Sequence, residues 1–320
     1  MTPGARLQAA IEILEQSFAA PFPVDATLEA YFRRRRYAGS GDRRAVQERV
    51  FNILRRKARL AWHVGRIAAA VPSPRALALA DLIVGELLSA DEAANLFASS
   101  RHAPAPLTET ERALARALEG SALDDPAMPD PVRHEYPAWL EQSLRVAFGD
   151  RMAEEMSALN RQAPLDLRVN AAKATREAAQ AALAAENVAA DPTPLSPSGL
   201  RVKGALRIGG TRAFKQGLVE VQDEGSQIVA ALVGARPGMT VVDFCAGAGG
   251  KTLALAAAML CASCEGTPTG VTRAQDRGAR QGKNAGRPAC AKPERLRFGE
   301  GRLIACDTSS MRLDRMTARL

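Results

Sequence analysis

The stretch VVDFCAGAGGKTLALAAAM, residues 241–259, decides how the C-terminal part of the chain folds. An apolar run over 241–244 leads into a glycine-rich turn, and an alanine-rich helical pattern follows it. Gly247, Gly249 and Gly250 remove the Cβ atoms that would keep a ligand away from the backbone. The helix after the turn would direct free N–H groups and its positive dipole end at a carboxylate or phosphate. The stretch therefore predicts a strand–turn–helix unit that binds a nucleotide-type ligand.

A second strand–helix pattern follows further along the chain. The apolar run LIAC, 303–306, ends at Asp307, and residues 308–320 have a helical pattern. Two such units in series indicate a parallel, doubly wound sheet, in which an acid after the second strand accepts hydrogen bonds from a ribose diol. Asp307 holds that place. Because two strands do not make a stable sheet of this kind, we expect the sheet to be incomplete.

Residues 260–300 lie between the two units and differ from both in composition. Only four of these 41 residues are large aliphatic or Phe, whereas six are Gly, three are Pro and eight are Arg or Lys. Such a segment buries too little apolar surface to offset its ordering entropy, so we predict disorder. Two origins remain open, a real insertion or unspliced or frame-shifted coding sequence. Without it, the spacing from Gly250 to Asp307 falls from 57 to 16 residues, near the usual value of about 20.

Two other nucleotide-binding motifs fit the glycine turn poorly. A phosphate-binding P-loop would also end in Gly-Lys-Thr, but it needs a glycine five places before Gly250, where this chain has Cys245. A dinucleotide-binding turn has the pattern G-x-G-x-x-G, whereas the order here is Gly247-x-Gly249-Gly250. The residues disfavour both readings.

The N-terminal part has a helical pattern without strand-like alternation. Leu7, Ile11, Leu14 and Phe18 recur at spacings of three and four, which places them on one helix face. A third helical pattern covers 76–88, and Thr108 with Glu111 predicts a capping box for a helix at 109–118. We assign 1–131 to an all-α domain.

The middle of the chain, 132–216, reads as a helical linker followed by a small α+β unit, and 217–320 holds the two strand–helix units. The pattern between 132 and 222 predicts helices at 136–148, 150–160 and 175–186, and strands at 165–170, 200–202, 206–208 and 218–222. The fold class is therefore multi-domain: all-α, then small α+β, then the first two βα units of an α/β sheet.

The charge of the chain favours a polyanionic partner. The formal charge is +8 and the pI about 9.6. Twelve Arg or Lys between Tyr31 and Arg66 face only two acids. A solvated helix face and contact with RNA phosphates explain this cluster equally well.

The remaining composition indicates a cytoplasmic protein. The five cysteines are odd in number and irregularly spaced, which argues against a disulfide framework. No apolar run is long enough to span a bilayer, and the N-terminus lacks the features of a signal peptide.

Three strings in order resemble one enzyme family: GLVEVQDEGSQIVAALV (217–233), PGMTVVDFCAGAGGKT (237–252) and GRLIACDTSSMRLDRM (301–316). They are similar to the RsmB/Nop/Sun family of S-adenosylmethionine-dependent RNA cytosine-C5 methyltransferases, over about 165–259 and 301–320. The N-terminal helices are similar to that family's NusB-like RNA-binding domain, and the small α+β unit is RRM-like. In the common family form of the loop, Ala-Pro stands where this chain has Gly247-Ala248.

The resemblance implies S-adenosylmethionine as cofactor and RNA, in particular rRNA, as the substrate of a monomeric enzyme. It places Asp307 on the ribose, and the methionine end of the cofactor within a loop made of Cys245, Ala246, Gly247, Ala248, Gly249, Gly250 and Lys251. The RNA contacts would come from the basic helical segment, through Arg33, Arg34, Arg35, Arg36, Arg43, Arg44, Arg55 and Arg56.

The family uses one cysteine thiolate to attack C6 of cytosine and a second cysteine to release the product, in Pro-Cys and Thr-Cys motifs. This sequence contains neither motif, so we predict no catalytic residue in it. Cys245 and Cys306 are expected to be buried and structural. Cys261 and Cys264 form a C-x-x-C followed only by Cys290, without a nearby histidine, so no metal site is expected.

Two functions remain open at this point. The chain belongs by resemblance to an RNA cytosine-C5 methyltransferase that is inactive in this form, with weak or undetectable cofactor affinity. Alternatively, it is a non-catalytic fragment that binds RNA or cofactor.

Overall fold

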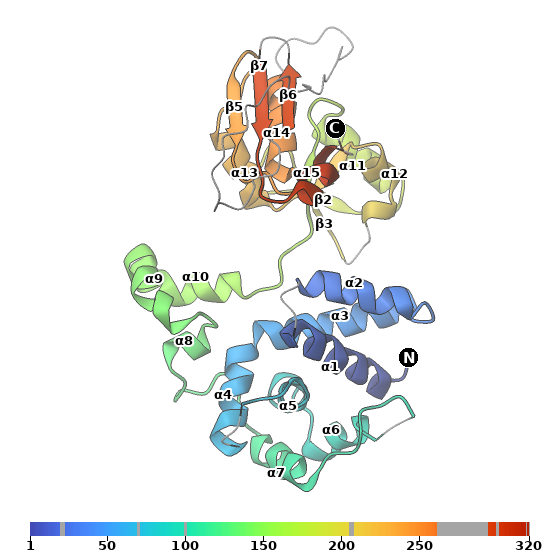
Figure 1. The fold of residues 1–320 in the computed structure, drawn as a ribbon, viewed down its shortest axis with the longest axis vertical. Coiled ribbons are helices and arrows are strands. Elements are labelled where there is room, and N and C mark those ends of the chain that lie inside the picture. Colours follow the sequence, from blue (N-terminus) through green and yellow to red (C-terminus); the bar gives the residue numbers. More distant parts are fainter. Residues whose placement is uncertain are drawn as a thin grey trace, which may run out of the picture. The chain divides into compact units, whose positions relative to one another are not determined.

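The computed structural model describes residues 1–19, 23–68, 71–98, 101–204, 208–260, 294–298, 301–317 and 319. They belong to two compact units, Met1–Gln162 and Ala163–Leu320, each with a core of its own (Figure 1).

The first unit is helical. Its larger helices are α1 (Pro3–Ala19), α2 (Val24–Arg34), α3 (Ser40–Arg55), α4 (Lys57–Ala68), α5 (Pro74–Ala80), α6 (Ala90–Leu96) and α7 (Glu109–Leu118). Helix α5 packs against α1, α4 and α7 (Figure 1). Leu7, Ile11 and Leu14 of the predicted apolar stripe are buried in the shared core, whereas Phe18 is 39% exposed and has the Lys57 ammonium 4.1 Å from its ring centre. Three of the four stripe residues thus build the core.

Two local predictions in this unit are confirmed, one of them with a difference. The Thr108 hydroxyl accepts from the Glu111 N–H at 3.2 Å and the Glu111 carboxylate accepts from the Thr108 N–H at 2.9 Å, which completes the capping box. The helix predicted over 76–88 begins at Pro74, and a single π-helical turn, Asp81–Gly85, follows it. The buried Asp81 carboxylate in that turn accepts from Arg56 at 2.8 Å.

The linker helices group with the helical unit rather than with the α+β unit. They are α8 (Asp130–Arg133), α9 (Glu141–Phe148) and α10 (Met152–Leu159), with short 3₁₀ turns at Ala138–Leu140 and Gly149–Arg151. The division at Gln162 therefore lies beyond the boundary expected at 131.

The second unit begins with a four-stranded antiparallel sheet. Its elements are β1 (Asp166–Val169), α11 (Arg176–Ala184), β2 (Ala190–Pro192), β3 (Gly199–Val202), α12 (Arg212–Lys215) and β4 (Val219–Val221), with strand order β2-β3-β1-β4. This βαββαβ sequence of elements is ferredoxin-like. Strand β4 pairs with β1, so the sheet extends past the boundary expected at 216.

The strand predictions in this sheet are partly right. Those at 165–170, 200–202 and 218–222 are confirmed by β1, β3 and β4. The one at 206–208 is wrong at Ile208, which begins a 3₁₀ turn, while 206 and 207 lie outside the described residues. Strand β2, which contains Pro192, was not among the predicted strands. The proline is tolerated there because β2 is an edge strand.

A second sheet follows, with strand order β5-β7-β6. Strands β5 (Thr240–Asp243) and β7 (Gly301–Ala305) are parallel, as predicted, with Val241 opposite Leu303. Helix α13 (Glu224–Leu232) precedes them, and α14 (Gly250–Leu260) and α15 (Ser310–Thr317) follow β5 and β7 in turn.

The disorder prediction for 260–300 does not hold throughout. Residues 294–298 form β6, which pairs with β7 in antiparallel fashion. Leu260 is the last residue of α14, and 261–293 with 299 and 300 lie outside the described residues.

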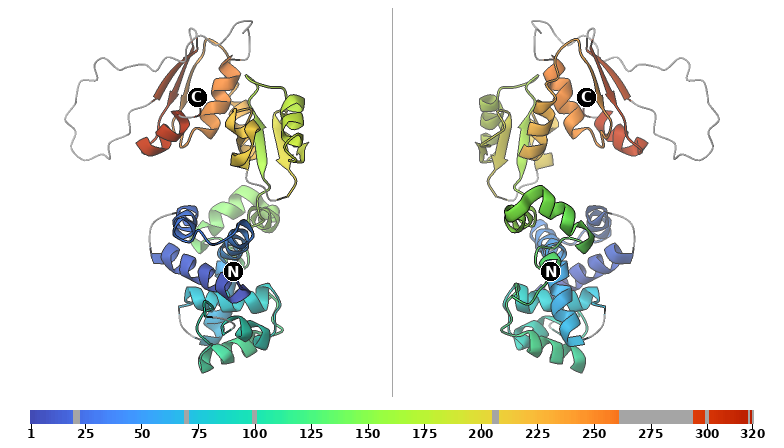
Figure 2. Two further views of the ribbon diagram at one scale, coloured as in Figure 1. Left: turned by 90° about the vertical axis from the view of Figure 1, so that its right-hand side faces the viewer. Right: turned by 90° about the vertical axis from the view of Figure 1, so that its left-hand side faces the viewer.

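The two faces of β5 differ in burial. Helix α14 lies against one face of the sheet (Figure 2), where Val241 packs with Leu255 and Leu303. Val242 points to the other face and is 55% exposed, and Phe244, directly after the strand, is 77% exposed. Among the described residues, helices therefore cover only one face of the sheet from which the ligand loop emerges.

Candidate functional site

The glycine loop between β5 and α14 is held to the neighbouring strand by a continued backbone ladder. The Cys306 N–H donates to the Asp243 carbonyl at 2.8 Å, and the Ala246 N–H donates to the Cys306 carbonyl at 2.8 Å. The Gly249 N–H then closes a turn onto the Ala246 carbonyl at 2.8 Å. The loop is thus fixed at its entry by β7 and at its exit by α14.

Two of the three glycines have left-handed backbone angles, for which side chains are unfavourable. Gly247 has φ +56° and Gly249 has φ +88°. Their surroundings differ. A Cβ at Gly247 would have no heavy atom within 4 Å, so this position faces open space, whereas a Cβ at Gly249 would overlap the Met316 side chain. Gly247 thus leaves room beside the backbone, and Gly249 allows α15 to pack against the loop.

Asp307 lies directly beside the glycine loop, as its position after the second strand predicts. Its carboxylate accepts from the Gly247 N–H at 2.9 Å and from the Ser309 N–H at 2.8 Å. The hydrogen bond from the Ser309 N–H lowers the pKa of Asp307, and the one from the Gly247 N–H adds to this effect. Both outweigh burial, which tends to raise the pKa. The acid is therefore ionised at neutral pH and braces the loop with one of its oxygens.

A second acid at the base of the loop was not predicted. Asp243 is the last residue of β5, and its carboxylate accepts from the Thr252 hydroxyl at 2.6 Å. Thr252 is fully buried. The bond links the two ends of the loop, and its sequence signal is the Asp before the turn together with the Thr after Gly-Gly-Lys.

The ferredoxin-like sheet supplies one side of the loop. Arg319 pairs with the carboxylate of Glu220 in β4 and donates to the Ala248 carbonyl at 2.9 Å. Gln222 follows β4, and its amide nitrogen lies 3.9 Å from where a Cβ on Gly250 would stand. Sequence reasoning missed all three of these side chains because they come from segments far apart in the chain.

Two further polar groups lie close to the loop. The buried Arg168 of β1 donates through Nε to the side-chain oxygen Oε1 of Gln222 at 2.6 Å, and burial lowers the pKa of Arg168. The Lys251 ammonium donates to the Ser226 hydroxyl of α13 at 3.4 Å. Lys251, which was expected at the cofactor, thus has a protein partner.

The prediction of buried cysteines is wrong for Cys245, which is exposed, and Cys306 is only partly buried. The alternation of β5 ends at Asp243, so Cys245 already belongs to the turn and does not point to the core. Cys261, Cys264 and Cys290 lie outside the described residues.

These features fit S-adenosylmethionine. The open space at Gly247 and the start of the 11-residue helix α14 suit the charged methionine end. Asp307 keeps lone pairs for the ribose hydroxyls after it has accepted two backbone N–H groups.

The predicted RNA-contacting arginines fall into two groups. Five of the eight have partners within the helical unit: Glu29 for Arg33, Glu12 for Arg35, the Ala38 carbonyl for Arg43, Asn52 for Arg55 and Asp81 for Arg56. Arg34, Arg36 and Arg44 are exposed and have no hydrogen bond or ion pair with any described residue. Of the eight, these three are the arginines whose charge is not shared with a partner among the described residues.

Among the residues that the structure describes, no helix is both long and apolar enough to cross a bilayer.

Comparison with known proteins identifies relatives of one kind. Residues 136–209 match the family described as "Methyltr_RsmF/B-like, ferredoxin-like domain". The chain is 34% identical over 121 residues to the ribosomal RNA small subunit methyltransferase B of Sodalis glossinidius, and 36% identical over 124 residues to that of Pseudomonas putida. Each match covers 38% of this chain and 28% of the relative. These matches confirm the resemblance to the RsmB/Nop/Sun family that the motifs predict.

The matches cover only part of each relative. The chain spans less than a third of the length of these two relatives, and 52% of the Erwinia tasmaniensis protein of the same name, at 27% identity. The solved structure titled "Crystal Structure of PH0851" covers 100% of this chain with a TM-score of 0.63 and 19% identity, and the chain covers 67% of it. That likeness shows a shared fold.

Proposed function

We propose that this chain carries the S-adenosylmethionine-binding part of an rRNA cytosine-C5 methyltransferase. The observation that carries the proposal is the hydrogen bond from the Gly247 N–H to Asp307, which joins a glycine loop after one parallel strand to an acid after the next. This is the position at which doubly wound sheets bind their ligands.

Each side of the loop has a role in binding. The free N–H groups at the start of α14 receive the carboxylate of the methionine end, next to the open space at Gly247. Asp307 accepts from the ribose hydroxyls as a carboxylate, and the backbone N–H groups that lower its pKa also hold it beside the loop. When bound, the cofactor supplies an electrophilic methyl group on a sulfonium.

The RNA substrate is proposed from the relatives and from charge. The relatives' names refer to the RNA of the small ribosomal subunit. Arg34, Arg36 and Arg44, with no partner among the described residues, supply a positive surface on the helical unit for phosphates.

For the polypeptide as printed we propose binding without methyl transfer, which corresponds to the second candidate function. The sequence contains no Pro-Cys or Thr-Cys dipeptide. Of the described cysteines, Cys245 lies exposed in the glycine loop and Cys306 is partly buried after β7. Cofactor binding should be weak, because β5 has a single neighbouring strand, β7, in the described sheet.

The test combines two measurements on the purified chain. Radiolabelled S-adenosylmethionine and ribosomal RNA should give no labelled RNA, and calorimetry should give no micromolar dissociation constant for the cofactor. Labelled 5-methylcytosine would contradict the claim that transfer is absent, and a micromolar constant would contradict the claim that the pocket is weak.

A further inference from the structure

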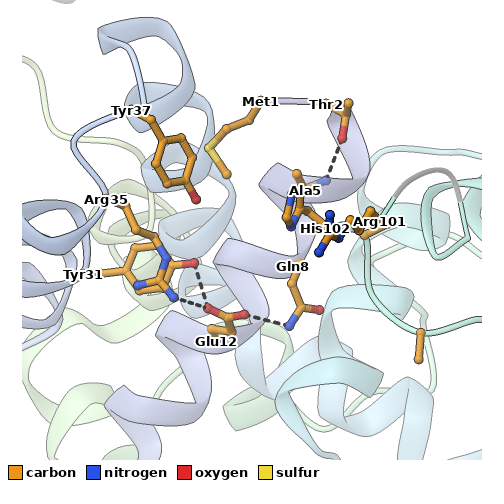
Figure 3. Close-up of a pocket in the computed structure, with 12 residues that line it drawn as sticks. Met1, Thr2, Ala5, Gln8, Glu12, Tyr31, Arg35, Tyr37, Arg101 and His102 are labelled. Atoms are coloured by element: carbon orange, nitrogen blue, oxygen red, sulfur yellow. Dashed lines mark hydrogen bonds and ion pairs between the residues drawn. The ribbon is translucent and has the colours of Figure 1, made fainter.

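A cavity of about 880 Å³ opens on the helical unit. Its floor is α1, with Gln8 and Glu12, and one wall is the end of α2 with Arg35 and the following Tyr37 (Figure 3). Residues 101–105 form the opposite wall. Its volume is within the range of about 300–1,000 Å³ that is usual for pockets holding small-molecule-sized ligands.

The acid on the floor of the cavity is already satisfied. Glu12 accepts from the Tyr31 hydroxyl at 2.8 Å, from Arg35 at 3.1 Å and from Gln8 at 2.9 Å. The Arg35 guanidinium also lies 3.7 Å from the centre of the Tyr31 ring. Glu12 thus fixes Arg35 as a flat surface stacked on a buried aromatic ring, and the charge of Glu12 is neutralised by that arginine.

Three of the other lining side chains are exposed. Tyr37 is 73% exposed, and Arg101 and His102 are exposed with no hydrogen bond or ion pair to any described residue. Figure 3 shows Tyr37 on the same side of the cavity as Arg35 and Tyr31, with Arg101 and His102 across from them. The cavity therefore combines an exposed aromatic ring, a stacked guanidinium and an unpaired cation.

We infer that this cavity holds one unpaired nucleotide of an RNA strand, with its base between Tyr37 and the Arg35 guanidinium and its phosphate at Arg101. Bases that leave a duplex stack on aromatic rings and on arginine planes, while phosphates take the cations. An acidic peptide would use the cations but would leave Tyr37 and the stacked Arg35 unused. Arg34 and Arg36, adjacent in sequence to the lining residues, extend the positive surface for neighbouring phosphates.

The inference rests on the proposed function, since it names the surface by which the helical unit would take its RNA. It adds a preference that the general basic charge does not supply: single-stranded over double-stranded RNA.

The test is fluorescence anisotropy of the full chain with a short labelled single strand and with a duplex of the same sequence. Tyr37→Ala should weaken single-strand binding about 5- to 100-fold, from the loss of one stacked base, and leave duplex binding unchanged. Tyr37→Trp should restore it. Trp139→Ala is the matched control, because Trp139 is 78% exposed in the same unit and does not line the cavity. Similarly, Arg101→Ala should weaken binding. Arg116→Ala, at an exposed arginine with no partner among the described residues and away from the cavity lining, should not.

The outcomes separate the inference from its premise. If wild type binds RNA and only Arg34→Ala, Arg36→Ala and Arg44→Ala together weaken it, RNA binding stands and the nucleotide cavity is wrong. Displacement of RNA by polyglutamate of equal charge would instead identify the cavity as a site for acidic peptides. Absence of RNA binding by the wild-type chain would contradict both the inference and the RNA part of the proposed function.

Discussion

In the helical unit, Leu14, Ile53 and Leu60 lie in one continuous core shared by the first seven helices. In the second sheet, Leu303 and Val241 belong to a small cluster under α14, and Phe244, directly after β5, is largely exposed. Helices that follow one another along the chain complete a core from neighbouring segments. A parallel sheet needs further strands and a second layer of helices, from segments more distant in sequence. The region with the recognisable ligand loop is thus the less enclosed of the two.

The largest expected contrast is between core truncations in the two regions. Leu14→Ala should destabilise the helical unit by about 2–5 kcal/mol, because it leaves a cavity in a fully packed site. Both tryptophans, Trp62 and Trp139, belong to this unit, so urea unfolding followed by tryptophan fluorescence reports on it. Phe244→Ala should change the exchange protection of β5 and β7 amides by less than about 0.5 kcal/mol. A loss above about 2 kcal/mol at Phe244 would show that this side chain is packed.

A second contrast lies within the loop, between adjacent glycines. Gly249→Ala should destabilise local packing by about 1–3 kcal/mol, because its φ is +88° and a Cβ would overlap Met316. Gly250→Ala is the matched control: its new Cβ would lie 3.9 Å from the Gln222 amide, an ordinary contact. Hydrogen exchange of the α14 amides measures the loss of local stability in both variants. Equal protection in the two variants would mean that the turn does not require a left-handed residue at 249.

A smaller, pH-dependent effect is expected in the helical unit. Burial tends to raise the pKa of Glu111, but hydrogen bonds from Arg75 and Thr108 outweigh it, so the pKa is lowered on folding. The carboxylate therefore stabilises the fold above its unfolded pKa of about 4.3, and this contribution disappears as the pH falls through the lower folded value. Glu111→Gln should cost about 1 kcal/mol at neutral pH and less in acid.

Tryptophan-detected urea unfolding at several pH values checks this prediction. Glu109→Gln is the control, because Glu109 begins the same helix but is exposed and makes no hydrogen bond with a described residue. A Glu111→Gln deficit that stays constant into acid would mean that its charge is not involved.

Local patterns predicted the parts of the molecule that depend on neighbours in sequence. The capping box at Thr108, the turn at Gly247 and Gly249, and the acid at Asp307 follow from short spacings or from the end of an apolar run. The burial of Cys245 was predicted wrongly because this residue lies in the turn, two residues beyond the end of β5 at Asp243.

The rest depends on contacts between distant segments, which carry no periodicity. Arg319 meets Glu220 across 99 positions of sequence, and Arg56 meets Asp81 across 25. Such pairs explain why the sequence alone could not separate the paired arginines of the basic segment from the unpaired ones. The acids that neutralise Arg35 and Arg56 lie in other helices.

The central claim, that the loop over 245–251 with Asp307 binds S-adenosylmethionine, is tested most directly by saturation-transfer NMR on the full chain with millimolar cofactor. Saturation should reach the ribose and methionine protons in the wild type. Asp307→Asn should lose the ribose signal, while Asp314→Asn, at an exposed acid of α15 with no partner among the described residues, should match wild type. An unchanged ribose signal in Asp307→Asn, or no saturation transfer to the wild type's ligand, would contradict the account.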